Sequence, residues 1–267
     1  MLKKRLIACL LWQDGLIVQT VNFIHTNFVG NAFVAVDFFN SWAIDEIIIL
    51  DISPSEIGRE KYYQTIQEIS RRCFVPLTVG GKIKTTEEIR KILSLGADKI
   101  CINSQAFKNP RFVTDASQFF GAQCVVVSID VRLIDNNYRV FIENGTLMTE
   151  LSPFDWARQV EALGAGELFL TSIDRDGSRI GYDLDLLKGV ADSVKIPVIA
   201  SAGVGSWEHL AEGIELGGAN AVSAANIFHY SEQSTKKAKN YLKEKGIDVR
   251  EPEFYKILTP RKPVYKA

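Results

Sequence analysis

The sequence predicts one α/β domain, a single (β/α)8 TIM barrel built from two half-barrel repeats. Three observations lead to this fold class: short runs rich in valine and isoleucine, longer amphipathic segments between them, and an internal repeat. Near-continuously apolar strands are typical of a parallel sheet that helices cover on both sides. The 267 residues suit one such barrel, since barrels of this kind reach ~250 residues.

Eight runs have the length of buried strands, and each is followed by a segment with helical periodicity. Ser152 before Pro153, and Ser206, are typical N-cap positions that support the helix starts. A hairpin is predicted over residues 132–148. The predicted strands cover residues 5–11, 46–52, 75–79, 99–103, 124–130, 167–173, 196–201 and 220–224. The predicted helices cover residues 31–43, 55–72, 85–95, 111–120, 152–163, 184–193, 206–216 and 232–245.

The repeat pairs residues 75–81 with residues 196–203, because each stretch joins an Ile/Val-Pro strand start to a glycine turn. The spacing between the two prolines also separates Glu46 from Glu167, and each of these glutamates opens a strand. In this frame Leu11 corresponds to Asp130, so only one half ends its first strand on a carboxylate. We expect the barrel to span residues 1–249 and a C-terminal extension to span residues 250–267.

Composition excludes several classes of partner. A formal charge of −1 with 46% hydrophobic residues gives no basic excess for nucleic acid or anionic membrane. No run approaches the ~18 apolar residues of a membrane span, and no cleavable leader is evident, so a cytoplasmic protein is expected. The four cysteines form no CxxC pair, and no metal or cofactor is predicted.

In a (β/α)8 barrel the catalytic groups sit at the C-terminal ends of the strands. Asp130 ends the apolar run 125–129, and an apolar setting raises the pKa of a carboxyl group and suits it to acid–base work. The alternative is a structural carboxylate that caps a loop or pairs with Arg132. Both interpretations stay open on position alone.

Glycine turns follow three predicted strands, at Gly80-Gly81, Asp176-Gly177 and Ala202-Gly203. Exposed backbone N–H groups in such turns bind phosphate, and two turns from the two half-barrels would suit an elongated bis-phosphate. The alternative is that these glycines only close tight turns.

At the opposite end, four strands open on a charge: Arg5, Glu46, Lys99 and Glu167. Two cations and two anions around one barrel end can form a closed ring, because buried charges are tolerated when they are paired. Such a ring is either purely structural or a gate across the lower opening of the barrel.

Three stretches carry a family resemblance: residues 170–177 (Leu-Thr-Ser-Ile-Asp-Arg-Asp-Gly), 96–103 (Gly-Ala-Asp-Lys-Ile-Cys-Ile-Asn) and 125–130 (Val-Val-Val-Ser-Ile-Asp). From residue 4 to about 249 the chain resembles the cyclase subunit of imidazole glycerol phosphate synthase, the HisF family. The resemblance implies a HisH-like glutaminase partner whose ammonia crosses the barrel to attack a bis-phosphate imine. The products are imidazole glycerol phosphate and an aminoimidazole carboxamide ribotide.

The resemblance also implies roles for individual residues. Asp130 matches a catalytic aspartate, and the four strand-opening charges match the ammonia gate of the family. The phosphate-site positions that the resemblance implies are Gly81, Lys82, Asn103, Ser104, Asp176, Gly177 and Gly203.

Three departures lie at the catalytic end. The second catalytic aspartate of the family falls on Leu11, a lysine of its phosphate-closing loop on Gln19, and the third glycine of a turn on Lys82. Residues 9–11 and 141–146 are similar to a divergent group of these subunits that is associated with surface polysaccharides. There, a glutaminase and a cyclase-like barrel supply ammonia to a third, ATP-dependent enzyme that forms an acetamidino group on a sugar.

Three hypotheses follow. The first is a HisF-like amidotransferase subunit that conducts ammonia for amidination of a surface-polysaccharide sugar. The second is an active histidine-pathway cyclase that relies on Asp130, aided by Lys82 or Asp176. The third is a catalytically silent partner that only activates a glutaminase. Cyclase activity is an open question at this point, because leucine can move no proton.

Overall fold

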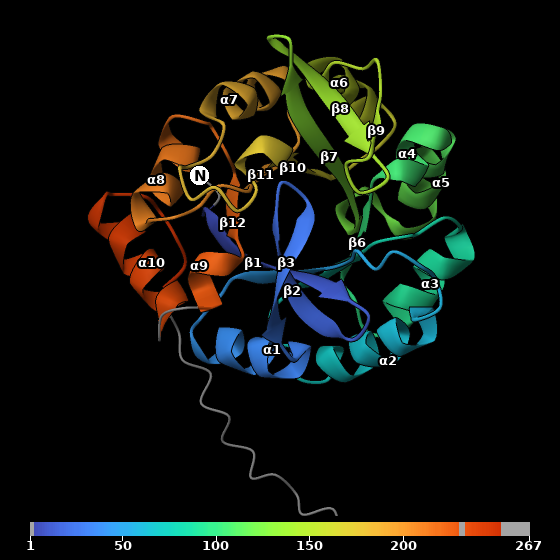
Figure 1. Ribbon diagram of the computed structural model, residues 1–267, viewed down its shortest axis with the longest axis horizontal. Helices are drawn as coiled ribbons and strands as arrows, with labels where there is room; N and C mark the ends of the chain where they lie inside the picture. Colours follow the sequence, from blue (N-terminus) through green and yellow to red (C-terminus); the bar gives the residue numbers. More distant parts are fainter. Residues whose placement is uncertain (1–2, 230–232, 252–267) are drawn as a thin grey trace, which may run out of the picture.

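The computed structural model describes residues 3–229 and 233–251, and it shows the predicted closed barrel (Figure 1). Eight parallel strands form the wall, and pairing of β1 with both β12 and β4 and of β7 with β10 closes it. The prediction of eight strands is confirmed, with boundaries that differ by up to a few residues. The strands are β1 (Arg5–Gln13), β4 (Glu46–Asp51), β5 (Leu77–Gly80), β6 (Lys99–Ile102), β7 (Val125–Ile134), β10 (Glu167–Ser172), β11 (Val198–Ser201) and β12 (Ala221–Ala224).

Helices surround the barrel, as Figure 1 shows. Two short helices, α4 (Ser104–Lys108) and α9 (Asn226–His229), were not predicted. The predicted helix 55–72 begins only at Arg59, and residue 232 of the predicted last helix lies outside the described residues. The outer helices are α1 (Ala32–Ser41), α2 (Arg59–Ser70), α3 (Thr86–Ser94), α5 (Arg111–Phe120), α6 (Pro153–Ala162), α7 (Leu184–Ser193), α8 (Trp207–Glu215) and α10 (Ser234–Glu244).

The two predicted N-caps behave differently. Ser152 accepts a hydrogen bond from the backbone N–H of Phe154, as expected for an N-cap followed by proline. Ser206 occupies the N-cap of α8 but makes no capping bond with its side chain. The N–H of Gly205, one residue before this cap, donates to Nδ1 of His209 at 3.1 Å.

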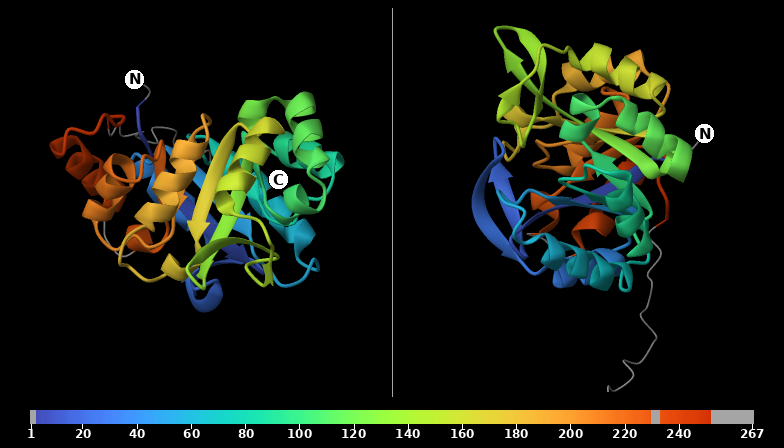
Figure 2. Two further views of the ribbon diagram at one scale, coloured as in Figure 1. Left: turned by 90° about the horizontal axis from the view of Figure 1, so that it is seen from above. Right: turned by 90° about the vertical axis from the view of Figure 1, so that its right-hand side faces the viewer.

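Two hairpins project from the same end of the barrel (Figure 2). The hairpin predicted over 132–148 is present, formed by the end of β7 with β8 (Asn137–Ile142) and β9 (Leu147–Met148). The hairpin of β2 (Leu16–Val21) and β3 (Ile24–Gly30) was not predicted. Its two turn residues, Asn22 and Phe23, both have positive φ, which suits a two-residue hairpin loop.

The barrel has two separate apolar cores. The larger lies between the strands and the helices, and a smaller one fills the barrel interior. Successive side chains of a strand point to opposite faces, so each strand supplies both cores. The inner core comprises Ile7, Cys9, Ile48, Cys101, Val126, Phe169, Ile199 and Ala221, with Leu11 and Leu50 packed against it.

The last helix is fastened to the first strands by a buried ion pair. Lys239 on α10 donates to Asp45 at 2.6 Å, and both side chains are 2% exposed. Asp45 also accepts the N–H of Leu6 on β1 at 2.8 Å. Nearby, the backbones of Lys4 and Val249 form a parallel β-bridge. The chain therefore stays in contact with the residue before β1 as far as Val249. The predicted extension 250–267 lies outside the described residues from residue 252 onward.

Among residues 3–229 and 233–251, no helix is both long and apolar enough to cross a bilayer.

We predict that Lys239→Met lowers the free energy of unfolding by about 3–5 kcal/mol, because it leaves the Asp45 carboxylate buried without its cation. Urea unfolding measures this difference. Lys243→Met on the same helix is the matched control, since its pair with Glu251 is exposed to solvent and its loss should change stability little. Equal losses in the two variants would contradict the prediction.

Candidate active site at the barrel mouth

The four strand-opening charges form a closed ring at the N-terminal end of the barrel. Arg5 pairs with Glu46 at 2.8 Å and also with Glu167. Lys99 completes the ring, at 2.9 Å from Glu46 and 3.0 Å from Glu167. Thr78 donates a further bond to Glu46 at 2.9 Å. The ring therefore pairs both nearly buried glutamates, while the two cations retain 19% exposure.

Above the ring, the barrel interior is apolar. Ile7 and Ile48 follow Arg5 and Glu46 along their strands, Phe169 follows Glu167, and Val126 on β7 is the register partner of Glu167. Cys9 and Cys101 also face this lumen; burial raises the pKa of the Cys9 thiol to about 12, and it raises that of Cys101 as well. At neutral pH both thiols are uncharged and behave as small apolar groups.

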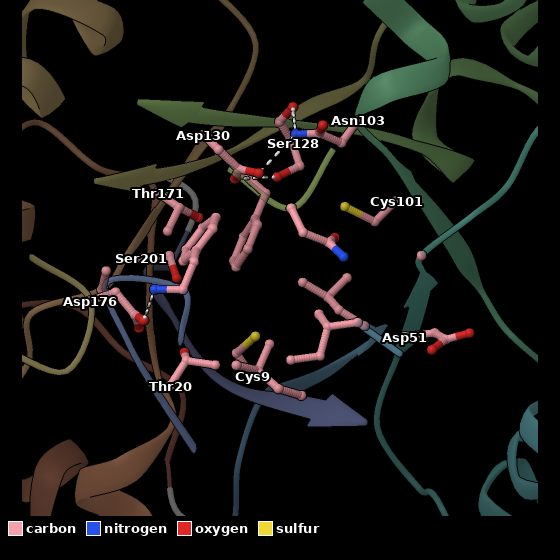
Figure 3. Close-up of a pocket in the computed structure, with 18 of the residues that line it drawn as sticks. Cys9, Thr20, Asp51, Cys101, Asn103, Ser128, Asp130, Thr171, Asp176 and Ser201 are labelled. Atoms are coloured by element: carbon pink, nitrogen blue, oxygen red, sulfur yellow. Dashed lines mark hydrogen bonds between the residues drawn. The ribbon is translucent and has the colours of Figure 1, made fainter. Parts of the chain in front are cut away.

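The lumen leads into a cavity of about 600 Å³ at the C-terminal end of the strands. Figure 3 shows side chains from several strands facing this space. The cavity is where a (β/α)8 barrel places its chemistry. It brings together every residue predicted for this end: Gly81, Lys82, Asn103, Ser104, Asp130, Asp176, Gly177 and Gly203.

Asp130 lies in this cavity and is 9% exposed. Its two carboxyl oxygens accept bonds from Ser128 at 3.1 Å and from Asn103 at 3.0 Å (Figure 3). Burial raises the pKa of Asp130 to about 7; the charge of Asp176 adds to the increase, and the two hydrogen bonds oppose it. The alternative pairing with Arg132 is not observed, because that arginine pairs with Asp174 at 3.3 Å.

Asp176 fastens the unpredicted hairpin to the cavity wall. Its carboxylate accepts the N–H of Phe23 at 3.0 Å and its carbonyl accepts that of Asn22 at 3.2 Å. Burial also raises the pKa of the Asp176 carboxyl group. Gly177 allows the close approach, since a Cβ there would lie 2.7 Å from the carbonyl oxygen of Thr20. The hairpin thereby places Thr20 and His25 in the cavity lining.

Leu11 and Trp12 face opposite sides of the barrel wall. Leu11 lines the cavity beside Leu50, its register partner on β4. Trp12 is fully buried on the outer side, with its ring centroid 4.9 Å from that of Tyr62. The strand end is apolar on both faces, and the cavity has no carboxylate at the position opposite Asp130 in the half-barrel repeat.

The turn after β5 differs from a simple glycine turn. Gly81 has φ of +98°, and a Cβ there would lie 2.3 Å from the backbone oxygen of Asp51. Lys82 also adopts a left-handed φ of +56°, a backbone conformation that residues other than glycine rarely adopt. Its ammonium donates to the carbonyl of Ser55 and lies 3.9 Å from Asp51. Lys82 therefore introduces a cation at the cavity edge.

Two predicted phosphate-site residues already have protein partners. Asn103 donates to Asp130 and to the carbonyl of Ser128. Ser104 donates to Asn103 at 3.2 Å and accepts the N–H of Glu143 at 3.0 Å. Both residues hold the cavity wall, and a phosphate there would have to share their hydrogen bonds.

Sequence reasoning missed several cavity residues. Thr20 and His25 belong to the unpredicted hairpin, and Lys84 and Lys108 carry no local signal for the cavity. These two lysines pair with glutamates at the cavity edge, Glu56 and Glu143. Within the described ranges no group of three or more His, Cys, Asp or Glu residues could hold a metal ion, and none of the four cysteines is in a disulfide.

Comparison with known proteins places this geometry in a family. A family model described as "Histidine biosynthesis protein" matches residues 5–234. The chain belongs to this family. A curated relative, the imidazole glycerol phosphate synthase subunit HisF of Clostridium botulinum (strain Okra / Type B1), is 45% identical over 252 residues. The match covers 94% of this chain and 100% of the relative, so this histidine biosynthesis family member is HisF-like over its whole barrel.

The raised pKa of Asp130 predicts a pH-dependent stability for this family member. The folded protein holds this proton more tightly than the unfolded chain, whose Asp pKa is ~3.9. The stabilising contribution is therefore present below about pH 4 and is lost as the pH rises to about 7. Asp130→Asn removes the dependence and should raise stability at pH 8 by on the order of 2–4 kcal/mol, but much less at pH 4.

Urea unfolding at the two pH values measures the difference. Asp192→Asn, in an exposed pair with Lys188 on α7, controls for the loss of one negative charge. An Asp130→Asn effect of the same size at both pH values would show that its carboxyl group is not perturbed.

Proposed function

We propose that this chain is the ammonia-receiving barrel subunit of a glutamine-dependent amidotransferase. One observation carries the proposal: an apolar lumen joins a closed charge ring at one end of the barrel to a cavity lined by the carboxyl groups of Asp130 and Asp176 at the other. Neutral ammonia suits such a lumen, whereas ammonium would lose its hydration there at high cost. The ring would then act as the gate through which ammonia enters.

A glutaminase would bind at the ring end. Exposed aromatic and aliphatic side chains precede strand starts there: Phe74 before β5, Phe119 before β7 and Leu216 before β12. Large exposed apolar groups on one face are typical of protein interfaces. The curated relative is itself named as a subunit of a synthase, which supports an assembly of this kind.

The fate of the ammonia depends on the mouth of the barrel. Leu11 leaves Asp130 without the second carboxylate that the cyclase mechanism employs, and removal of an acid–base group costs about 10²–10⁴-fold in rate. We therefore propose that the nitrogen acceptor is a surface-polysaccharide sugar, amidinated by a third, ATP-dependent enzyme that receives ammonia from this barrel. This assignment rests on Leu11 and on the resemblance to the divergent group.

The alternative is an active imidazole glycerol phosphate synthase cyclase of histidine biosynthesis. It is favoured by 45% identity along the full length of a curated HisF. It is also favoured by Asp130, since a carboxyl group with a pKa of about 7 can give and take protons at neutral pH. In this case the bis-phosphate substrate would lie between the turns at Gly81 and Gly203.

Turnover of the bis-phosphate imine with saturating ammonium and no glutaminase separates the two functions. We expect Leu11→Asp to exceed the unmodified protein by at least about 10²-fold, because it restores a second carboxylate opposite Asp130. Leu50→Asp is the matched control, since Leu50 pairs with Leu11 and lines the same cavity. Rapid turnover by the unmodified protein would establish the histidine-pathway alternative.

The glutaminase site is tested by the rate of glutamine hydrolysis in a mixture with a HisH-like glutaminase. We expect this chain to stimulate the rate, and we expect Phe74→Asp/Phe119→Asp to abolish the stimulation by placing charges in the contact. Ile24→Asp/Phe28→Asp, on the exposed hairpin at the other end, should leave it intact. Stimulation with free escape of ammonia, unaffected by obstruction of the lumen, would favour the silent-partner hypothesis.

A further inference from the structure

Three cavity-lining residues have a buried side-chain polar atom without a hydrogen-bond partner among the described residues: Thr20 and His25 on the β2–β3 hairpin, and Ser223 in the barrel wall. Ser223 on β12 is 0% exposed, and its Oγ has no hydrogen-bond partner within the described ranges. Ser223 nevertheless lines the cavity. Buried hydroxyl groups are almost always hydrogen-bonded, so an unpaired one at a cavity wall indicates a bound molecule that completes it.

The position of Ser223 is the inner end of the cavity, where the lumen opens. Ala221, two residues earlier on the same strand, belongs to the lumen core, so Ser223 points to the same side one step nearer the mouth. Its backbone is fixed, because the buried hydroxyl of Tyr182 donates to the carbonyl of Ser223 at 2.8 Å. The Ser223 side chain therefore starts from a fixed strand position at the boundary between the apolar lumen and the cavity.

Polar groups continue from Ser223 along the neighbouring strands. Thr171 on β10 is the register partner both of Ser201 on β11 and of Asp130 on β7. Ala200 pairs with Val222, so Ser201 and Ser223 stand at the same level one residue further on. All four side chains line the cavity, and Figure 3 shows Asp130, Thr171 and Ser201 following one another around one side of it.

The facing wall has the opposite character. Cys9 and Leu11 on β1 and Leu50 on β4 present apolar groups to the same cavity. A small polar molecule that leaves the lumen beside Ser223 therefore finds a continuous row of hydrogen-bonding groups along the β12–β11–β10–β7 side. Ammonia can accept from one hydroxyl through its lone pair while it donates to another, so a row of hydroxyl groups suits it.

We propose that Ser223 Oγ binds one small neutral molecule at the end of the lumen, and that ammonia binds there before it passes along Ser201 and Thr171 to Asp130. The inference rests on the proposed function for the identity of the molecule, and on the structure alone for the binding site. Water, which is close to ammonia in size and hydrogen bonding, is the probe for the site itself.

A crystal structure of the full chain that resolves ordered water tests the site. We expect a bound molecule within about 2.6–3.2 Å of Ser223 Oγ. Thermal unfolding gives a second measurement: Ser223→Ala should leave Tm unchanged or lower it, because the variant loses a satisfied hydroxyl. An empty site, or a Tm increase of a few degrees in Ser223→Ala, overturns the proposal, since either shows that the hydroxyl is merely unsatisfied.

Ser234→Ala is the matched control for stability. Ser234 is equally buried, but its hydroxyl donates to the carbonyl of Phe228 at 2.9 Å and lies outside the cavity lining. Its loss should lower Tm.

The route is tested in the complex with the glutaminase and the acceptor enzyme, by the glutamine consumed per nitrogen transferred. We expect Ser223→Ala to raise this ratio several-fold while glutamine hydrolysis is unchanged; an unaltered ratio overturns the route. If the unmodified complex transfers no nitrogen, the proposed function fails, and the crystal structure and Tm still decide whether Ser223 holds a molecule.

Discussion

The alternation of side chains along a β-strand is the constraint on which this molecule depends. On β1 it sends Arg5, Ile7, Cys9 and Leu11 into the barrel in that order, from charge to apolar groups. All eight strands are parallel, so their charged starts gather at one end and their polar ends at the other, with an apolar stretch between them. Ring, lumen and cavity are thus one consequence of strand direction and period.

Much of this arrangement could be predicted, because it follows from the local periodicity of apolar and polar residues. The strands are continuous Val/Ile runs, and a charge at a strand start, such as Glu46 or Glu167, can only be tolerated in a barrel if another charge meets it. Asp130 could be found for the same reason, since it ends such a run. The features that the sequence did not predict depend on residues far apart in the chain. Asp45, for example, pairs with Lys239 across 194 residues, and no local pattern predicts that contact.

The β2–β3 hairpin shows a different limit of prediction. Its second strand is largely exposed and includes His25 and Asn27, so it lacks the apolar alternation by which strands are recognised. What holds it in place is the Asp176 loop, more than 150 residues away, which receives the N–H of Phe23. The position of the hairpin at the mouth of the cavity therefore depends on a tertiary hydrogen bond. The barrel strands that line the inner part of the cavity follow from the period of apolar residues in the sequence.

The two thiols inside the lumen give the barrel a built-in reporter. Cys9 lies where the lumen meets the cavity, it is 6% exposed, and its high pKa leaves little reactive thiolate. An alkylating reagent that enters the mouth must cross the cavity to reach it. A ligand that fills the cavity should therefore slow the labelling of this cysteine, and the labelling rate reports how open the inner end of the cavity is.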